Sequence, residues 1–346
     1  MMELSQLNAS FRNRFPQRIV TVDSHTQGEA TRLVVDGVGP LPGKTMTEKC
    51  DYFQRHFDSI RLLLTREPRG HRDMLAAVIT EPVSPNGDFG LLYMDARRYP
   101  FLCGHATIGA VSTLVKLGRL AAPDGEKSFF VDTPSGPLEA RTRIQNGSAT
   151  SVSIRMVPSF VFAVDRVVDV PTLGRISMDL VCVGGFFAMV DAGAAGLDLS
   201  AETGERLVSA GMAVIDAANR SLSVRHPERP EVCTVDVAEF YAEIPGQESG
   251  GKSAVIYGES HIDRSPCGTG TTAKMTLLHH RGRLSLNQPY QNAGLLGTVF
   301  TGCLVEETSV GDLPAVVGEV RGSAQITGIS EFVVDPEDPF PEGFLI

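Results

Sequence analysis

The chain has 346 residues, of which 42% are hydrophobic and 21% are charged. This length is typical of about two domains, and this balance excludes a disordered chain. Lysine and arginine number 31 against 41 aspartates and glutamates, which gives a formal net charge of −10. Because nucleic acids and anionic membranes select basic surfaces, we expect a small-molecule partner, with no nucleic acid and no membrane.

The N-terminal segment 1–17 has no hydrophobic core of the kind found in secretory signals, so we expect a flexible extension. The most apolar stretch, 180–190, contains two glycines and is too short for a membrane span of about 20 residues. None of the six cysteines forms a Cys-x-x-Cys pair, and the eight histidines form no HExxH motif. We therefore expect a cytoplasmic protein with free thiols and no bound metal.

Short β-like runs separated by turn residues dominate the chain, which favours many strands and few helices. In the first half, strands are predicted at 18–22, 31–35, 74–80, 89–94, 128–133, 138–142 and 151–156, with helices at 48–63 and 104–117. In the second half, strands are predicted at 176–183, 186–190, 221–224, 234–241, 254–257, 297–304 and 331–334, with helices at 201–217 and 268–281.

Two of the predicted helices begin alike, with Cys-Gly-His at 103–105 and Cys-Gly-Thr at 267–269, about one domain length apart. This faint internal repeat suggests two similar β-rich domains, each with one central helix. The expected domains are an N-terminal one over 18–165, joined by 323–346, and a C-terminal one over 166–322.

A thiol at a helix start faces the positive end of the helix dipole and unpaired N–H groups, so we expect lowered pKa values for Cys103 and Cys267. The same N–H groups can bind a carboxylate. If both helices point into one cleft, one sulfur lies on each face of the α-carbon of a bound carboxylate. Inversion of that carbon needs proton removal on one face and delivery on the other, which two thiol groups can perform without a cofactor. His105 could instead pair with Cys103 in a hydrolase-like dyad, but we favour a ligand-binding role because it need not face the sulfur.

From about Val20 onward the chain resembles the proline racemase superfamily, which contains proline racemases, hydroxyproline 2-epimerases and trans-3-hydroxyproline dehydratases. DRSPCGTGT at 263–271 carries the resemblance most strongly. The resemblance implies an α+β, diaminopimelate-epimerase-like fold, in which two similar β-rich domains each wrap around a central helix and the active site lies in the cleft between them. The other matching segments are DSHTQGE at 23–29, EPRGHRDM at 67–74, LCGH at 102–105, GGFFA at 184–188 and LGTVF at 296–300.

The resemblance also implies which residues act on the substrate. It identifies Cys103 and Cys267 as the two acid/base residues, and it implies that Asp263 accepts a hydrogen bond from the ring ammonium of an imino acid. It implies that the carboxylate is held by Gly104, His105, Gly268 and Thr269.

We therefore expect a cofactor-independent racemase or 2-epimerase that inverts the α-carbon of proline or a hydroxyproline. In the dehydratase branch the position of Cys267 is typically threonine, so cysteine here favours inversion over dehydration. The segment 240–244 has no histidine of the kind found in many hydroxyproline epimerases, which weakens 4-hydroxyproline and leaves proline and 3-hydroxyproline open. A dehydratase and a non-catalytic imino-acid binding protein are the alternatives, and the oligomeric state is open between monomer and homodimer.

Overall fold

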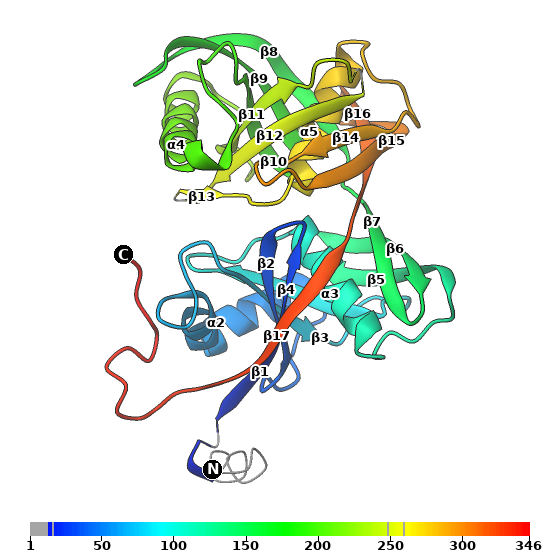
Figure 1. The fold of residues 1–346 in the computed structure, drawn as a ribbon, viewed down its shortest axis with the longest axis vertical. Helices are drawn as coiled ribbons and strands as arrows, with labels where there is room; N and C mark the ends of the chain where they lie inside the picture. Colours follow the sequence, from blue (N-terminus) through cyan, green and yellow to red (C-terminus); the bar gives the residue numbers. More distant parts are fainter. Residues whose placement is uncertain (1–12, 16, 248, 259) are drawn as a thin grey trace.

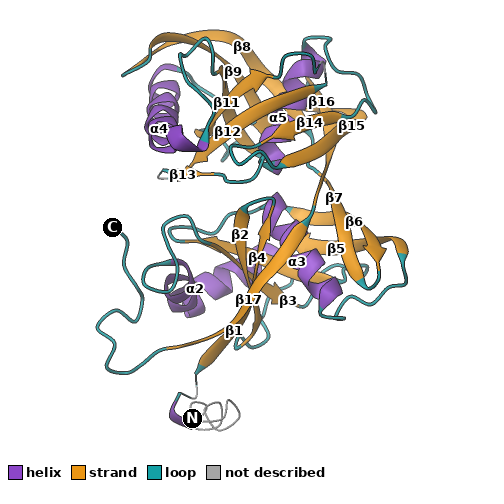
Figure 2. Ribbon diagram, viewed as in Figure 1, coloured by secondary structure: helices purple, strands orange, loops and turns teal. Residues whose placement is uncertain are grey.

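The computed structural model describes residues 13–15, 17–247, 249–258 and 260–346, and it forms two lobes that meet at a narrow waist (Figure 1). Most of the predicted N-terminal extension lies outside the described residues. Figure 2 shows that strands dominate both lobes and that one helix runs through the centre of each. This is the α+β, diaminopimelate-epimerase-like architecture that was expected.

The lower lobe in Figure 1 holds the first half of the chain and one late strand. Its elements are β1 (Arg18–Thr26), β2 (Glu29–Asp36), α2 (Met46–Thr65), β3 (Leu75–Thr80), β4 (Phe89–Asp95), α3 (Gly104–Lys116), β5 (Gly125–Thr133), β6 (Gly136–Gln145), β7 (Ser148–Arg155) and β17 (Ala324–Val333).

The upper lobe holds the remaining elements, with α5 at its centre and α4 on its flank. They are β8 (Ser159–Val170), β9 (Gly174–Val183), β10 (Gly185–Asp191), η1 (Ala201–Thr203), α4 (Gly204–Ser221), β11 (Val235–Glu243), β12 (Gly250–Tyr257), β13 (His261–Ile262), α5 (Gly268–His280), β14 (Tyr290–Ala293), β15 (Val299–Val310) and β16 (Leu313–Gly322).

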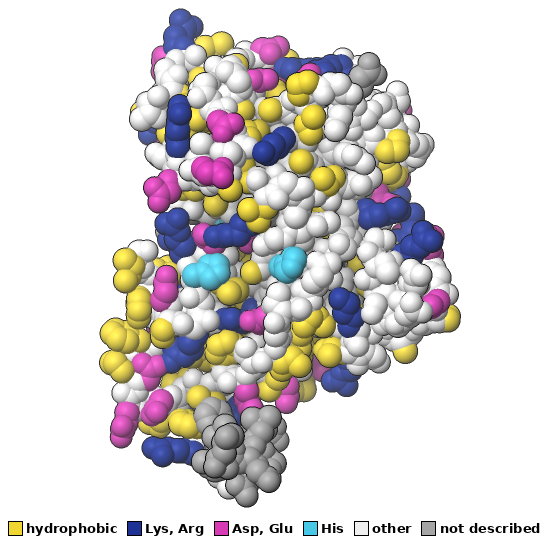
Figure 3. Space-filling model, viewed as in Figure 1, with side chains coloured by type: hydrophobic (Ala, Val, Ile, Leu, Met, Phe, Trp, Pro, Cys, Tyr) yellow, Lys and Arg dark blue, Asp and Glu magenta, His cyan; other side chains and the backbone are white. Residues whose placement is uncertain are grey.

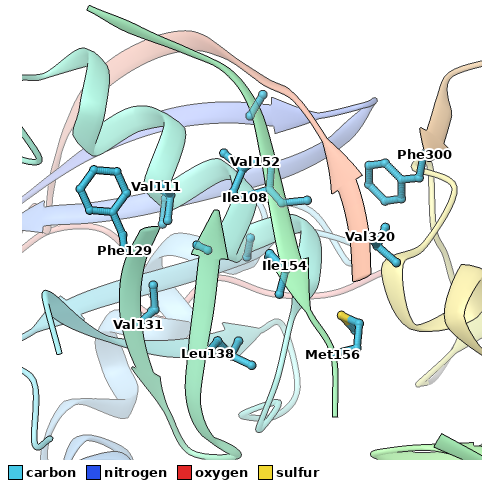
Figure 4. Close-up of a cluster of buried hydrophobic side chains, with 14 of the residues drawn as sticks. Ile108, Val111, Phe129, Val131, Leu138, Val152, Ile154, Met156, Phe300 and Val320 are labelled. Atoms are coloured by element: carbon cyan, nitrogen blue, oxygen red, sulfur yellow. The ribbon is translucent and has the colours of Figure 1, made fainter. Parts of the chain in front are cut away.

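The helix α3 is buried on nearly all sides, as its almost wholly apolar sequence predicted. Figure 4 shows Ile108 and Val111 of α3 packed against side chains of the surrounding strands, including Val131 of β5 and Val152 of β7. Burying such side chains contributes about 1.5–3 kcal/mol each, which fixes the helix inside its lobe. The start of the helix is thereby held at the waist.

The two lobes are joined by backbone hydrogen bonds between strands. The end of β16 pairs antiparallel with β7, where Glu319 lies opposite Arg155 and Gly322 opposite Val152. The chain then enters β17, which pairs antiparallel with β1 along its whole length. The lobes are therefore connected by a continuous ladder of strands.

All four predicted helices are confirmed, but some strand predictions are wrong. The strand expected at 221–224 does not form, because α4 continues to Ser221 and ends at Leu222. The strands β8, β13, β14 and β16 were not predicted. β8 runs across residue 165, where its pairing with β9 changes register. The domain limits 18–165 and 166–322 stay a prediction. No helix within the described residues is long and apolar enough to span a membrane.

Candidate active site

A cavity of about 720 Å³ lies at the waist, within the range typical of small-molecule sites. The first residues of α3 and α5 lie next to each other in its lining, since a Cβ built on Gly104 would lie 4.0 Å from the Cα of Gly268. Figure 3 shows histidine, arginine and acidic side chains gathered on the surface at this waist. The cavity is lined by all seven residues singled out from the sequence: Cys103, Gly104, His105, Asp263, Cys267, Gly268 and Thr269.

Cys103 is the N-cap residue of α3, with extended backbone angles. Its carbonyl oxygen accepts hydrogen bonds from the N–H of Thr107 at 3.1 Å and from the Thr107 hydroxyl at 2.8 Å. Its sulfur lies 3.3 Å from Nδ1 and 3.6 Å from Nε2 of His105. His105 therefore does contact the sulfur, which was not expected of a residue two positions further along the chain.

Cys267 holds the corresponding place at the start of α5. Its sulfur accepts a hydrogen bond from the N–H of Gly270 at 3.3 Å and lies 3.3 Å from Oγ1 of Thr269. In both helices, then, the residue two positions after the cysteine touches its sulfur. Cys267 has φ 57° and ψ 118°, a conformation that non-glycine residues rarely adopt. Such strain persists where the surroundings fix the residue, and it is concentrated at functional sites.

The expectation of lowered thiol pKa values is wrong for both cysteines. Burial raises the pKa of Cys103, and the N–H of Ala106 offsets only part of this. Burial also raises the pKa of Cys267, further assisted by the charge of Asp263, against the N–H of Gly270. Removal of the thiolate from water therefore outweighs the favourable helix start, and both groups are thiols at neutral pH.

His105 is buried, and this burial lowers the pKa of its imidazole to about 4. The ring is therefore neutral at physiological pH. A neutral imidazole of such low basicity is a poor proton acceptor for the Cys103 thiol, because a general base works best with a pKa near the operating pH. The contact consequently does not favour a hydrolase-like dyad.

Asp263 is 4% exposed and lines the same cavity. Its Oδ1 accepts hydrogen bonds from the backbone N–H of Ser265 at 2.8 Å and from the Ser265 hydroxyl at 2.7 Å. Burial and the charge of Glu29 raise the pKa of Asp263. A ligand cation at its second oxygen would favour the ionised form and offset the cost of burying that charge.

A buried ionic cluster joins the lobes beside the cavity. Oε2 of Glu29 accepts from the backbone N–H of Arg264 at 2.6 Å, and the Arg264 guanidinium lies 2.7 Å from Asp73. Nε2 of His261 lies 3.4 Å from Oε1 of Glu29, and its Nδ1 lies 3.7 Å from Oδ1 of Asp73. The ring of His261 stacks on Tyr257, which lines the cavity. Glu29 and Asp73 come from the lower lobe and His261 and Arg264 from the upper, so the cluster links the two lobes beside the cavity.

The apolar wall of the cavity was missed from the sequence, although Leu102 and Phe187 lie inside segments that carried the resemblance. Their position in those segments was the available signal. Within the part of the chain that is described, no group of three His, Cys, Asp or Glu side chains could hold a metal ion. The other four cysteines are free, and they are Cys50, Cys182, Cys233 and Cys303.

Comparison with known proteins gives the family. The proline racemase family model matches residues 21–345. The chain is 38% identical over 333 residues to a proline racemase of Clostridioides difficile, covering 96% of this chain and 99% of that protein. It is 40% identical over 326 residues to a 4-hydroxyproline 2-epimerase of Streptosporangium roseum, covering 94% of this chain and 97% of that protein.

A solved structure agrees with these relatives. A hydroxyproline epimerase from Agrobacterium vitis, with bound trans-4-hydroxy-L-proline, superposes with a TM-score of 0.88 at 27% identity and covers 96% of each chain. The fold, the family match and the relatives lead to one conclusion: the chain belongs to the proline racemase family and is an enzyme of the isomerase class.

Proposed function

We propose that this protein is a cofactor-independent racemase or 2-epimerase that inverts the α-carbon of proline or a hydroxyproline, with Cys103 and Cys267 as its two acid/base residues. The observation that carries the proposal is that both cysteines begin buried helices whose first residues come close together in the lining of one cavity. A bound imino acid would then present one face of its α-carbon to each sulfur.

The two sulfurs together account for every proton that moves in the reaction. One sulfur, as the thiolate, removes the α-proton and becomes a thiol, while the opposite thiol delivers its proton to the other face and becomes a thiolate. The enzyme is left with its proton on the other sulfur, and no oxidant or reductant is consumed. General acid–base catalysis of this kind requires only that each sulfur come within reach of the α-carbon.

The negative charge that develops in this reaction spreads from the α-carbon onto the carboxylate. The first N–H groups of a helix have no partner inside the helix, and those of Gly104, His105, Gly268 and Thr269 lie at the two helix starts that line the cavity. Preorganised donors of this kind stabilise developing charge more strongly than water does. We assign the carboxylate to these N–H groups.

We assign the ring ammonium of the substrate to Asp263. The carboxyl of Asp263 is buried and has hydrogen bonds from Ser265 on Oδ1, and a carboxylate has a second oxygen for a cation. The apolar side chains of Leu102, Phe187 and Val255 complete the cavity and suit the methylene groups of a five-membered ring. A small imino acid fits this combination of charge and apolar wall.

The test is chiral chromatography of L-proline, trans-4-hydroxy-L-proline and trans-3-hydroxy-L-proline after incubation with the purified enzyme. The proposal expects the α-epimer of at least one of the three, and it expects Cys103→Ser and Cys267→Ser to abolish this product. Formation of a cyclic imine from the 3-hydroxy compound, without the epimer, would identify a dehydratase instead. Binding without turnover would identify an imino-acid binding protein.

A further inference from the structure

The two helix starts resemble each other, but the side chains behind them differ in charge. Behind Cys103 lie two hydroxyl groups. The hydroxyl oxygen of Tyr93 is 2.6 Å from Oγ1 of Thr107, and the Thr107 hydroxyl donates a hydrogen bond to the Cys103 carbonyl. Behind Cys267 lies a carboxyl group, that of Glu239 on β11. The proposed mechanism makes no use of this carboxyl.

Glu239 lies directly under the first turn of α5. A Cβ built on Gly270 would be 2.9 Å from Oε2 of Glu239 and 3.2 Å from Cβ of Cys267. The N–H of the same Gly270 donates to the Cys267 sulfur. The Gly270 backbone therefore separates the carboxyl from the sulfur, and glycine is needed there because a side chain would collide with Glu239.

The carboxyl of Glu239 is fully buried and poorly compensated. Its exposure is 0%, and neither oxygen receives a hydrogen bond of good geometry from the described residues, although the Ser253 side chain is close enough to lower its pKa. The ammonium of Lys274, one turn further along α5, lies 3.2 Å from the ring centroid of Tyr241, and it forms no ion pair with Glu239 within 4 Å although both residues are described. Buried polar groups without partners are costly and rare, so this carboxyl calls for an explanation.

We propose that Glu239 is a positioning residue that disfavours the thiolate of Cys267 across the backbone of Gly270 in the first turn of α5. The catalytic meaning of this inference rests on the proposed function.

The order of ionisation follows from burial and charge. Burial raises the pKa of Glu239 to about 8, and the charge of Lys274 opposes this shift. Burial lowers the pKa of Lys274 to about 8, so its positive charge is lost over the same pH range. Cys267 ionises at higher pH and therefore does so beside a carboxylate that is already negative, which disfavours its thiolate.

Other titratable groups surround both sulfurs and act on them together with Glu239. Those near Cys267 and Glu239 are Asp263, Tyr257, Tyr241, Tyr290, Lys274 and Cys103. Those near Cys103 are Asp263, Glu29, Asp95, Tyr93 and Tyr257, with His105 in contact. Asp263 raises the pKa of both thiols, and its effect on Cys267 is larger than that of Glu239. The substitution of Glu239 alone therefore isolates the effect of this carboxyl.

The experiment is alkylation of the free full-length enzyme with iodoacetamide, with initial rates for the two cysteines followed separately by mass spectrometry. Only thiolates react, so each rate reports ionisation. At pH 9.5, Glu239→Gln should raise the ratio of the Cys267 rate to the Cys103 rate on the order of tenfold relative to the wild type, as expected for loss of a like charge nearby. The matched control is Glu243→Gln on the same strand, whose carboxylate is 57% exposed and paired with Arg283, and it should leave the ratio unchanged.

A wild-type measurement keeps the proposal testable if Glu239→Gln does not fold. The ratio of the Cys267 rate to the Cys103 rate should fall between pH 7 and pH 9.5 as Glu239 ionises near pH 8. A constant ratio in the wild type, or an unchanged ratio in Glu239→Gln, overturns the proposal. The readout needs no turnover, so absence of racemase activity would refute the proposed function while the ratio still decides the role of Glu239.

Discussion

Gly268 offers a substitution that separates folding from catalysis. A Cβ built on Gly268 would meet no atom within 4 Å, and its backbone has no positive φ, so alanine fits the fold without strain. Alanine at the first position of α5 should therefore leave stability unchanged or raise it by about 0.5 kcal/mol, because glycine loses more backbone entropy on folding. The added methyl group nevertheless projects from a residue that lines the cavity, where we place the carboxylate of the substrate.

For this reason Gly268→Ala should lower kcat/KM on the order of 100-fold, because a displaced carboxylate carries the α-carbon out of line with the two sulfurs. The matched control is Gly204→Ala at the first position of α4, where a Cβ also meets nothing within 4 Å. The control should match the stability of Gly268→Ala and keep full activity. Thermal unfolding and initial rates of α-epimer formation measure the two effects. Full activity in Gly268→Ala would refute the assignment of the carboxylate to these helix starts.

Three further outcomes are expected. Burial raises both thiol pKa values, so the reactive thiolate forms by loss of one proton across the range from pH 7 to pH 9. We therefore expect kcat/KM to increase by about tenfold per pH unit over this range. A flat pH profile would contradict this expectation. His261 is buried, which lowers its pKa, but Glu29 and Asp73 raise it more, so its folded pKa lies above the unfolded value. The stabilisation by protonated His261 is then complete below the unfolded pKa and is lost as the pH rises through the folded pKa. The loss of Tm caused by His261→Gln should therefore be larger at pH 5.5 than at pH 9. A loss of Tm that grows with pH would contradict this reasoning. A Cβ on Gly211 would lie 2.6 Å from Cβ of Ile256, so Gly211→Ala should lower the free energy of unfolding in urea by about 1–3 kcal/mol despite better helix propensity, and an equal or higher value would count against this packing.

The helix starts were predictable because their signals are local. A cysteine–glycine pair followed by an apolar run places the first residue of α3 at Gly104 and that of α5 at Gly268, as observed. The strand β8 was missed because Asp165, Arg166 and Asp169 give it the composition of a linker between two prolines. Only its pairing with β9 makes it a strand, and pairing partners are not visible in the local sequence.

The membership of the site was also predictable, whereas its electrostatics were not. Cys103 and Cys267 stood out because they occur in matching motifs, but the direction of their pKa shifts depends on how completely the folded chain removes them from water. Glu239 could not be singled out, because its segment reads as an ordinary strand and its place beneath Gly270 arises only when α5 packs on β11. Packing between segments that are distant in the sequence determines both the thiol pKa shifts and the position of Glu239.

Deuterium incorporation during the first turnovers in D₂O tests the two-sulfur mechanism most directly. With the enzyme acting on a single enantiomer, removal and delivery by different sulfurs predicts that the newly formed epimer carries solvent deuterium at the α-carbon while the unreacted substrate still carries hydrogen. If the remaining substrate instead gains deuterium as fast as the epimer forms, one group serves both faces, and the roles assigned to Cys103 and Cys267 are wrong.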